Sequence, residues 1–215
     1  MRDDTRRMAL DALQYELDKV PHGTPIIIED LCDRCEELVM NDAGGYEIEG
    51  RERYSDPIDL FVLEEDLIAH AEESGLVAIH EREGLVLRER VSRGEPVMTQ
   101  DIACLSLDVS TFMAIESDVS ILLEGSTVSL RRPIEGKASR PVDEVAQALD
   151  ELLSRCGVSE WDESYYPEHP ILDGTGWDLL IILKDGRALV SGGSNAWPES
   201  LDDLVDGLER IIVGF

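Results

Sequence analysis

Lysine is scarce in this 215-residue sequence, which contains only Lys19, Lys137 and Lys184. Lys and Arg together number 19 against 47 Asp and Glu, so the formal net charge is −28. Proteins that neutralise nucleic-acid phosphates or bind anionic membranes need a basic face. The charge balance therefore argues against both classes of partner.

The acidic residues are spread along the whole chain. Residues 1–100 and residues 101–215 each carry a formal charge of −14, which excludes a neutral domain followed by an acidic tail. Net charge bears on solubility and association rather than on the fold. Two explanations stay open: a surface that binds a basic partner, and an acidic composition shared by a whole proteome.

Long apolar runs are missing as well. The run at residues 179–183 is far shorter than the ~20 residues of a membrane-spanning helix, and no apolar segment of a signal peptide follows Met1. We therefore expect a cytoplasmic location without membrane contact. The four cysteines are then expected to be reduced thiols. They are Cys32, Cys35, Cys104 and Cys156.

Signatures of cofactor and metal sites are also lacking. The sequence has no Walker loop, dinucleotide-binding glycine pattern or HExxH motif. Cys32 and Cys35 have the CxxC spacing, but a structural zinc site needs two further ligands, and the acidic residues around the pair oppose the thiolate of a redox site. We predict no cofactor, no metal and no catalytic residue, and we expect both thiols to face the core.

The N-terminal part has the element order of a known DNA-binding fold. Apolar spacing predicts helices over 4–20, 31–40 and 60–74, a short strand at 24–28, and a hairpin of 76–80 with 85–89. Asp30 is expected to cap the second helix, Gly75 to end the third, and His80 to be partly buried. This order resembles a winged helix-turn-helix domain, although the polar loop 41–57 separates its second and third helices.

The resemblance implies that the third helix enters the major groove of DNA. Its solvent face offers Glu64, Glu65 and Asp66, which would repel phosphates. We therefore expect a scaffold or a protein-contact module rather than a DNA reader.

The C-terminal part is predicted to mix strands and helices. Strands are expected at 102–107, 111–115, 119–123 and 127–130, with a hairpin of 177–183 and 188–190 around the Asp-Gly turn. Pro141 is expected to open a helix capped by Ser139 or Arg140, and another helix starts near Ser200. The class is α+β, with a winged-helix-like module at 1–93, a linker at 93–97 and a mixed antiparallel-sheet and helix module at 97–215. A single mixed domain is the alternative.

A Gly-rich run, Ser191 to Asn195, precedes the last helix. Such a run can bind phosphate through backbone N–H groups, but no Lys or Arg follows it, which favours a turn with a helix cap. Residues 173–198, with DGTGW, DG and SGGSNAWP, resemble a pattern of uncharacterised bacterial proteins, with an extra glycine at Gly193. The resemblance covers about 171–212 and implies a small α+β unit.

Aromatic residues make up only 5% of the chain, yet all three tryptophans lie in its last quarter. We expect Trp177 and Trp197 to pack together, and the aromatic residues form either a structural core or a partner-binding patch. The candidate partner-binding residues are Trp161, Tyr165, Tyr166, Trp177, Trp197, Glu64, Glu65 and Asp66.

Three functions follow from these features. The leading prediction is a non-enzymatic acidic interaction protein that binds a basic protein partner, as immunity proteins and inhibitors do. The first alternative is a regulatory or dimerisation module built on the winged-helix-like part. The second is an enzyme centred on His169, with Glu168, Asp173 and Asp178 available for acid–base chemistry.

Overall fold

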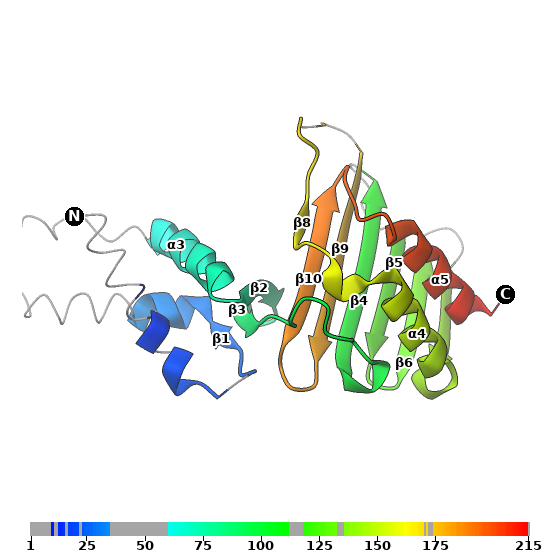
Figure 1. The fold of residues 1–215 in the computed structure, drawn as a ribbon, viewed down its shortest axis with the longest axis horizontal. Helices are drawn as coiled ribbons and strands as arrows, with labels where there is room; N and C mark the ends of the chain where they lie inside the picture. The colour runs from blue at the N-terminus through cyan, green and yellow to red at the C-terminus, as the bar shows by residue number, and fades with distance from the viewer. Residues whose placement is uncertain are drawn as a thin grey trace, which may run out of the picture. The chain divides into compact units, whose positions relative to one another are not determined.

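The chain divides into two compact units, Met1–Arg90 and Val91–Phe215 (Figure 1). The computed structural model describes residues 10, 13–15, 17–21, 23–34, 60–111, 118–132, 136–169, 171 and 174–214. Helices and antiparallel strands occur in both units, which confirms the α+β class. Among these residues no helix is long and apolar enough to cross a membrane.

The first unit packs helices against a small antiparallel sheet. Residues 13–15, 17–19 and 28–34 are helical, and the sheet has the order β1-β3-β2. The named elements are β1 (Ile26–Ile27), α3 (Leu60–Glu73), β2 (Leu76–Glu81) and β3 (Gly84–Glu89). The core contains Leu13, Ile28, Leu31, Leu67 and Leu87, each at most 1% exposed.

Three details of the first unit differ from the prediction. The second helix already includes Ile28, so Asp30 lies inside it and does not cap it. The hairpin turn has two residues, Arg82 and Glu83, because β2 and β3 continue to the turn. His80 is exposed because it lies next to this turn, beyond the buried Ile79. Cys35, the end of the predicted helix 31–40 and the loop 41–57 lie outside the described residues.

The second unit is built on a seven-stranded sheet of order β7-β6-β5-β4-β9-β10-β8. All neighbouring strands are antiparallel except β8, which runs parallel to β10. The strands are β4 (Ile102–Thr111), β5 (Val119–Glu124), β6 (Thr127–Arg132), β7 (Gly136–Pro141), β8 (Ser164–Tyr165), β9 (Thr175–Leu183) and β10 (Ala188–Ser194). The helices are α4 (Val142–Cys156) and α5 (Leu201–Val213), with 3₁₀ turns η2 (Thr99–Asp101) and η3 (Val158–Glu160).

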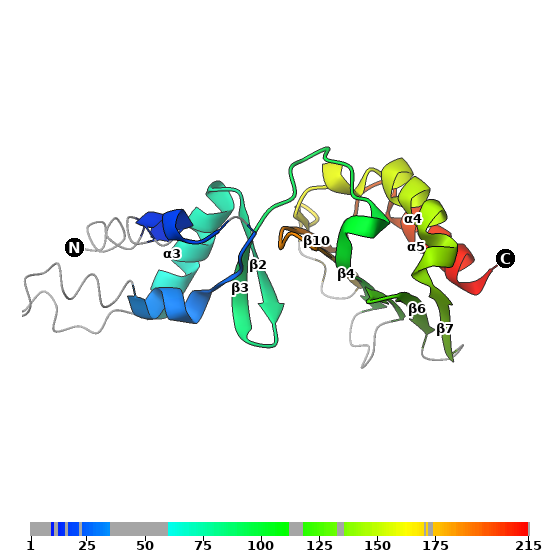
Figure 2. The same cartoon turned by 90° about the horizontal axis from the view of Figure 1, so that it is seen from below.

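Helices α4 and α5 cover one face of this sheet (Figure 2). Every second residue of the strands points to that face, as Val119, Ile121 and Leu123 do on β5. The helices contribute buried leucines at helical spacing, such as Leu149 and Leu208. Full burial of one such side chain is worth about 1.5–3 kcal/mol, so this layer is the main source of stability.

Two predictions for the sheet and α4 are wrong in detail. Residues 102–111 form one ten-residue strand, whereas separate strands were expected at 102–107 and 111–115. Residues 112–117 lie outside the described residues. Pro141 is the N-cap of α4 and lacks a side-chain cap, since Ser139 and Arg140 belong to β7. Strand β7 escaped prediction because Ala138 is its only partly buried apolar residue, as expected for an exposed sheet edge.

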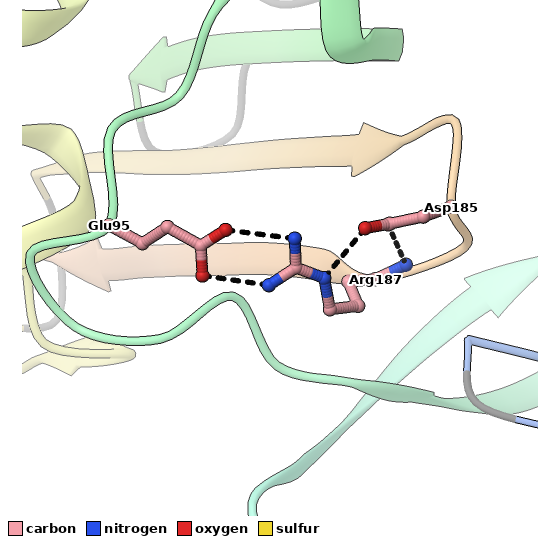
Figure 3. A network of polar contacts seen from close by, with 3 residues as sticks. All are labelled: Glu95, Asp185 and Arg187. Carbon is pink, nitrogen blue, oxygen red and sulfur yellow. Dashed lines mark hydrogen bonds and ion pairs between the residues drawn. The ribbon is translucent and has the colours of Figure 1, made fainter.

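The predicted linker 93–97 is packed onto the second unit. Val91 and Val97 are buried in its core. Glu95 accepts two hydrogen bonds from Arg187, at 2.7 and 2.8 Å, and the Arg187 Nε donates to Asp185 at 2.8 Å (Figure 3). Arg187, which holds this segment, lies 92 residues further along the chain, so the sequence gives no local sign of the contact.

The Glu95–Arg187 pair predicts a pH-dependent contribution to stability. The hydrogen bond from Arg187 lowers the pKa of Glu95, so its contribution is present above the unfolded pKa, about 4.3, and is lost as the pH falls through the folded pKa. Glu95 keeps 33% of its side chain exposed, so Glu95→Gln should cost only about 1 kcal/mol at pH 7. Urea unfolding should show this difference shrinking toward zero near pH 3.

The exposed Glu124 supplies the control. Glu124→Gln should leave the stability within experimental error of the wild type at both pH values. A Glu95→Gln deficit that persists unchanged at low pH would contradict the electrostatic origin.

Candidate functional site

Five aromatic residues are carried by the segment around β8, by β9 and by the turn after β10, and we call this region the aromatic corner. Its members are Trp161, Tyr165, Tyr166, Trp177 and Trp197. Trp177 of β9 is 1% exposed and lies at the centre. Trp161 packs edge-on against it at 5.8 Å between ring centroids, and Tyr165 packs at 5.7 Å.

This arrangement corrects two predictions. The indole that packs against Trp177 is Trp161, not Trp197, which is 48% exposed. Trp177 itself is buried, so it supports the corner and is unavailable to a partner. The sequence alone could not separate these choices, because the tryptophans lie on three different segments.

Hydrogen bonds from the indoles fix the chain on either side of the cluster. The Trp177 Nε1 donates to the Ala196 carbonyl at 2.9 Å, which holds the turn after β10. The Trp161 Nε1 donates to the Cys156 carbonyl at 3.1 Å and to the Ser200 Oγ at 3.3 Å. The segment after α4 and the segment before α5 are thereby joined.

The segment leading into β8 is held by backbone contacts. The buried Ser191 donates its hydroxyl to the Asp162 carbonyl at 2.6 Å. The Gly192 N–H donates to the Glu163 carbonyl at 2.9 Å, and the Asp162 N–H donates to the Tyr165 hydroxyl at 2.9 Å. Tyr166 follows directly and is 72% exposed.

The Gly-rich run is a strand, which corrects the prediction of a turn and removes the phosphate-loop alternative. Gly192 and Gly193 pair with Asp178 and Trp177 on one side and with β8 on the other. A Cβ on Gly193 would lie 2.5 Å from the Tyr165 carbonyl oxygen, 2.7 Å from that of Ala196 and 2.9 Å from the Trp177 Nε1. The glycine is therefore required for close packing.

Asn195 completes the motif by reversing the chain after β10. It adopts the left-handed conformation (φ 57°), which asparagine tolerates better than most residues. Its side-chain oxygen accepts the Thr175 N–H at 2.9 Å, while its own N–H donates to the Thr175 carbonyl at 2.8 Å. These contacts give the asparagine of the SGGSNAWP segment a structural role.

The close approach at Gly193 also brings together the backbone segments that carry the two exposed rings. The carbonyl oxygens of Tyr165 and Ala196 both lie within 2.7 Å of the same point, and the next residues are Tyr166 and Trp197. Both rings thus project from backbone that is fixed by hydrogen bonds and buried aromatic packing. Exposed, preorganised aromatic side chains are typical anchors of protein interfaces.

Acidic residues flank the exposed rings along the chain. Residues 158–169 and 195–203 together contain seven Asp or Glu residues and no Lys or Arg. Arg93 pairs with two of them, Asp162 at 3.1 Å and Glu160 at 3.5 Å, and it remains 66% exposed. Such exposed pairs contribute little energy, so the corner keeps its negative character.

The other predicted residues lie apart from the corner in sequence or are not drawn into it by any described contact. Glu64, Glu65 and Asp66 are on α3 of the first unit, where Glu65 is exposed and the other two are half-buried. His169 is exposed; Asp173, one of its proposed carboxylates, lies outside the described residues. Cys32 is buried, and the described part of the chain holds no group of three His, Cys, Asp or Glu that could bind a metal.

Comparison with known proteins adds no assignment to this geometry. No family model, curated protein or solved structure matches the chain.

The packing at Gly193 predicts that this position tolerates no side chain. Gly193→Ala should lower the free energy of unfolding by about 1–3 kcal/mol, because two carbonyls and an indole nitrogen occupy the space of the new methyl group. Thermal denaturation followed by near-ultraviolet circular dichroism would report both the loss and the changed tryptophan environment.

Gly176 on the paired strand is the matched control. A Cβ there would find its nearest neighbours at 3.8 and 3.9 Å, which is ordinary contact, so Gly176→Ala should unfold at or above the wild-type temperature. Equal effects of the two substitutions would contradict the assigned role of Gly193.

Proposed function

We propose that this protein is a non-enzymatic binding protein that engages a basic protein segment through the aromatic corner. The observation that carries the proposal is the pair of exposed rings, Tyr166 and Trp197, held on rigid backbone within an acidic surface. Aromatic faces attract Lys and Arg side chains directly, and nearby carboxylates add charge-assisted hydrogen bonds.

The charge distribution supports a basic partner rather than an acidic one. Glu168 and Glu199 are exposed and follow the two rings by two residues each. The overall charge of −28 would accelerate encounter with a cationic protein at low ionic strength. Inhibitors and immunity proteins that occupy basic grooves use this combination, and the same mode of action is proposed for this chain.

The first unit adds a second acidic surface to the proposal. Its exposed Glu65, Glu72 and Glu73 on α3 favour protein contact over contact with nucleic acid. We therefore propose that the winged-helix-like module serves as a scaffold or as a regulatory element that contacts protein.

Binding to synthetic peptides would test the proposed site. The probes are peptides in which Arg and Lys alternate with apolar residues, titrated into the full chain by fluorescence anisotropy. We expect at least one to bind with an affinity that falls steeply with added salt. The double variant Tyr166→Ala, Trp197→Ala should lose at least about tenfold, because anchor residues typically carry more than 1.4 kcal/mol each.

Tyr15→Ala is the control, since Tyr15 is 56% exposed on the first unit and its ring lies 3.5 Å from the Lys19 Nζ. It should bind the peptides as the wild type does. Failure of every basic peptide to bind, or equal binding by the double variant, would refute the proposed site.

A further inference from the structure

The face of the seven-stranded sheet opposite α4 and α5 carries an ordered row of charges. The strand registers place Lys137 beside Arg131, Arg131 beside Ser120, Ser120 beside Asp108, and Asp108 beside Asp178. Residues opposite each other on neighbouring strands point to the same face, with Cβ atoms about 5 Å apart. The row therefore runs from two cations on β7 and β6 to two carboxylates on β4 and β9.

Side-chain alternation confirms that this row lies away from the helices. Its immediate neighbours on β4 and β9, Leu107 and Trp177, are buried in the core that α4 and α5 cover. Lys137, Arg131 and Asp178 are exposed. Ser106 donates to Asp108 at 2.9 Å across two residues of the same strand, as expected for side chains on one face.

The two carboxylates of the row, Asp108 and Asp178, lie directly opposite each other on β4 and β9, which costs energy in an isolated sheet. Directly opposed like charges on neighbouring strands are destabilising. Partial burial raises the pKa of Asp178, and the negative charge of Asp108 adds to the shift. A cation from outside the sheet would relieve the repulsion between the carboxylates.

We infer that a second copy of this chain docks on this face, with a two-fold axis that runs along β5 between the facing sheets. Rotation about that axis places β7 over β9 and β6 over β4 of the other copy. Lys137 then faces Asp178 of the second copy, and Arg131 faces Asp108. Each contact occurs twice in such an isologous dimer.

The residues at the centre of the face are compatible with a two-fold axis along β5. Ser120 and Leu122 of β5 would each meet their own copies, and Leu122 is a large apolar residue with 37% of its surface exposed. On either side of it, Ser129 of β6 would face Ser106 of β4. Aligned sheets pack about 10 Å apart, a distance that Lys or Arg spans to reach a carboxylate.

The charge order also selects this axis over the other simple choice. A two-fold axis that follows the row, across the strands, would place each strand over its own copy in the opposite direction, so Lys137 would meet Lys137 and Asp178 would meet Asp178. Of these two axes, only the one parallel to the strands brings opposite charges together. The pattern is thus self-complementary in one orientation, which gives the interface its specificity.

Sedimentation equilibrium of the full chain over a range of concentrations tests the inference. The wild type should be in monomer–dimer equilibrium, and salt should weaken the dimer. Lys137→Asp alone and Asp178→Lys alone should each raise the dissociation constant at least about tenfold, since each places like charges at two symmetric contacts. The double variant that exchanges the two charges should return to within about threefold of the wild type, because it recreates both contacts in reverse.

Charge-matched controls lie on α4, which covers the opposite face. Asp143→Lys and Arg155→Asp change exposed residues by the same amount of charge and should leave the dissociation constant unchanged. Circular dichroism of every variant checks that the sheet is intact.

A wild type that stays monomeric at all concentrations would overturn the inference. So would a dimer that is indifferent to both single substitutions, or a charge exchange that fails to restore association. Because the aromatic corner takes no part in this contact, failure of the peptide-binding experiment leaves the result of this one unaffected.

Discussion

The buried indole of Trp177 is the contact on which the C-terminal end of the second unit depends. Its ring packs against Trp161 and Tyr165, and its nitrogen holds the Ala196 carbonyl. Because these groups come from different segments, one side chain fixes β8, the turn after β10 and the approach to α5 together. Gly193 makes this convergence possible, since any side chain there would separate the three. The exposed rings of Tyr166 and Trp197 owe their positions to this buried framework.

Most regular elements follow from local sequence signals. Helices α4 and α5 were predictable because their buried leucines recur at helical spacing, and the hairpin of β9 and β10 was predictable from apolar strands around an Asp-Gly turn. Strand β7 was missed because an exposed edge has little apolar alternation to read. The glycines at 192 and 193 suggested a turn, but here they serve close packing between strands, which depends on neighbours distant in sequence.

The functional surfaces were less predictable for the same reason. The sequence located the aromatic residues of the corner but gave no indication which indole is buried, because that depends on the pairing of β8 with β10. The attachment of residues 91–97 depends on Glu95 and Arg187, which are 92 residues apart. The charge row is spread over five strands, and its order exists only once the strand registers are known.

Strand β9 connects the two proposed surfaces. Its consecutive residues Trp177 and Asp178 point to opposite faces, so one joins the aromatic cluster and the other joins the charge row. Because β10 and β8 lie beyond the strands that would face each other, docking of a second copy on the open face would leave the corner of each copy unoccupied. A dimer would then present two corners to a basic partner. A partner with two basic segments would bind more tightly, because binding of the first segment raises the effective concentration of the second at the other corner. Net acidity alone says little about function, but its local arrangement differs between the two surfaces. Carboxylates outnumber cations at the corner, whereas the open face combines Asp108 and Asp178 with Lys137 and Arg131.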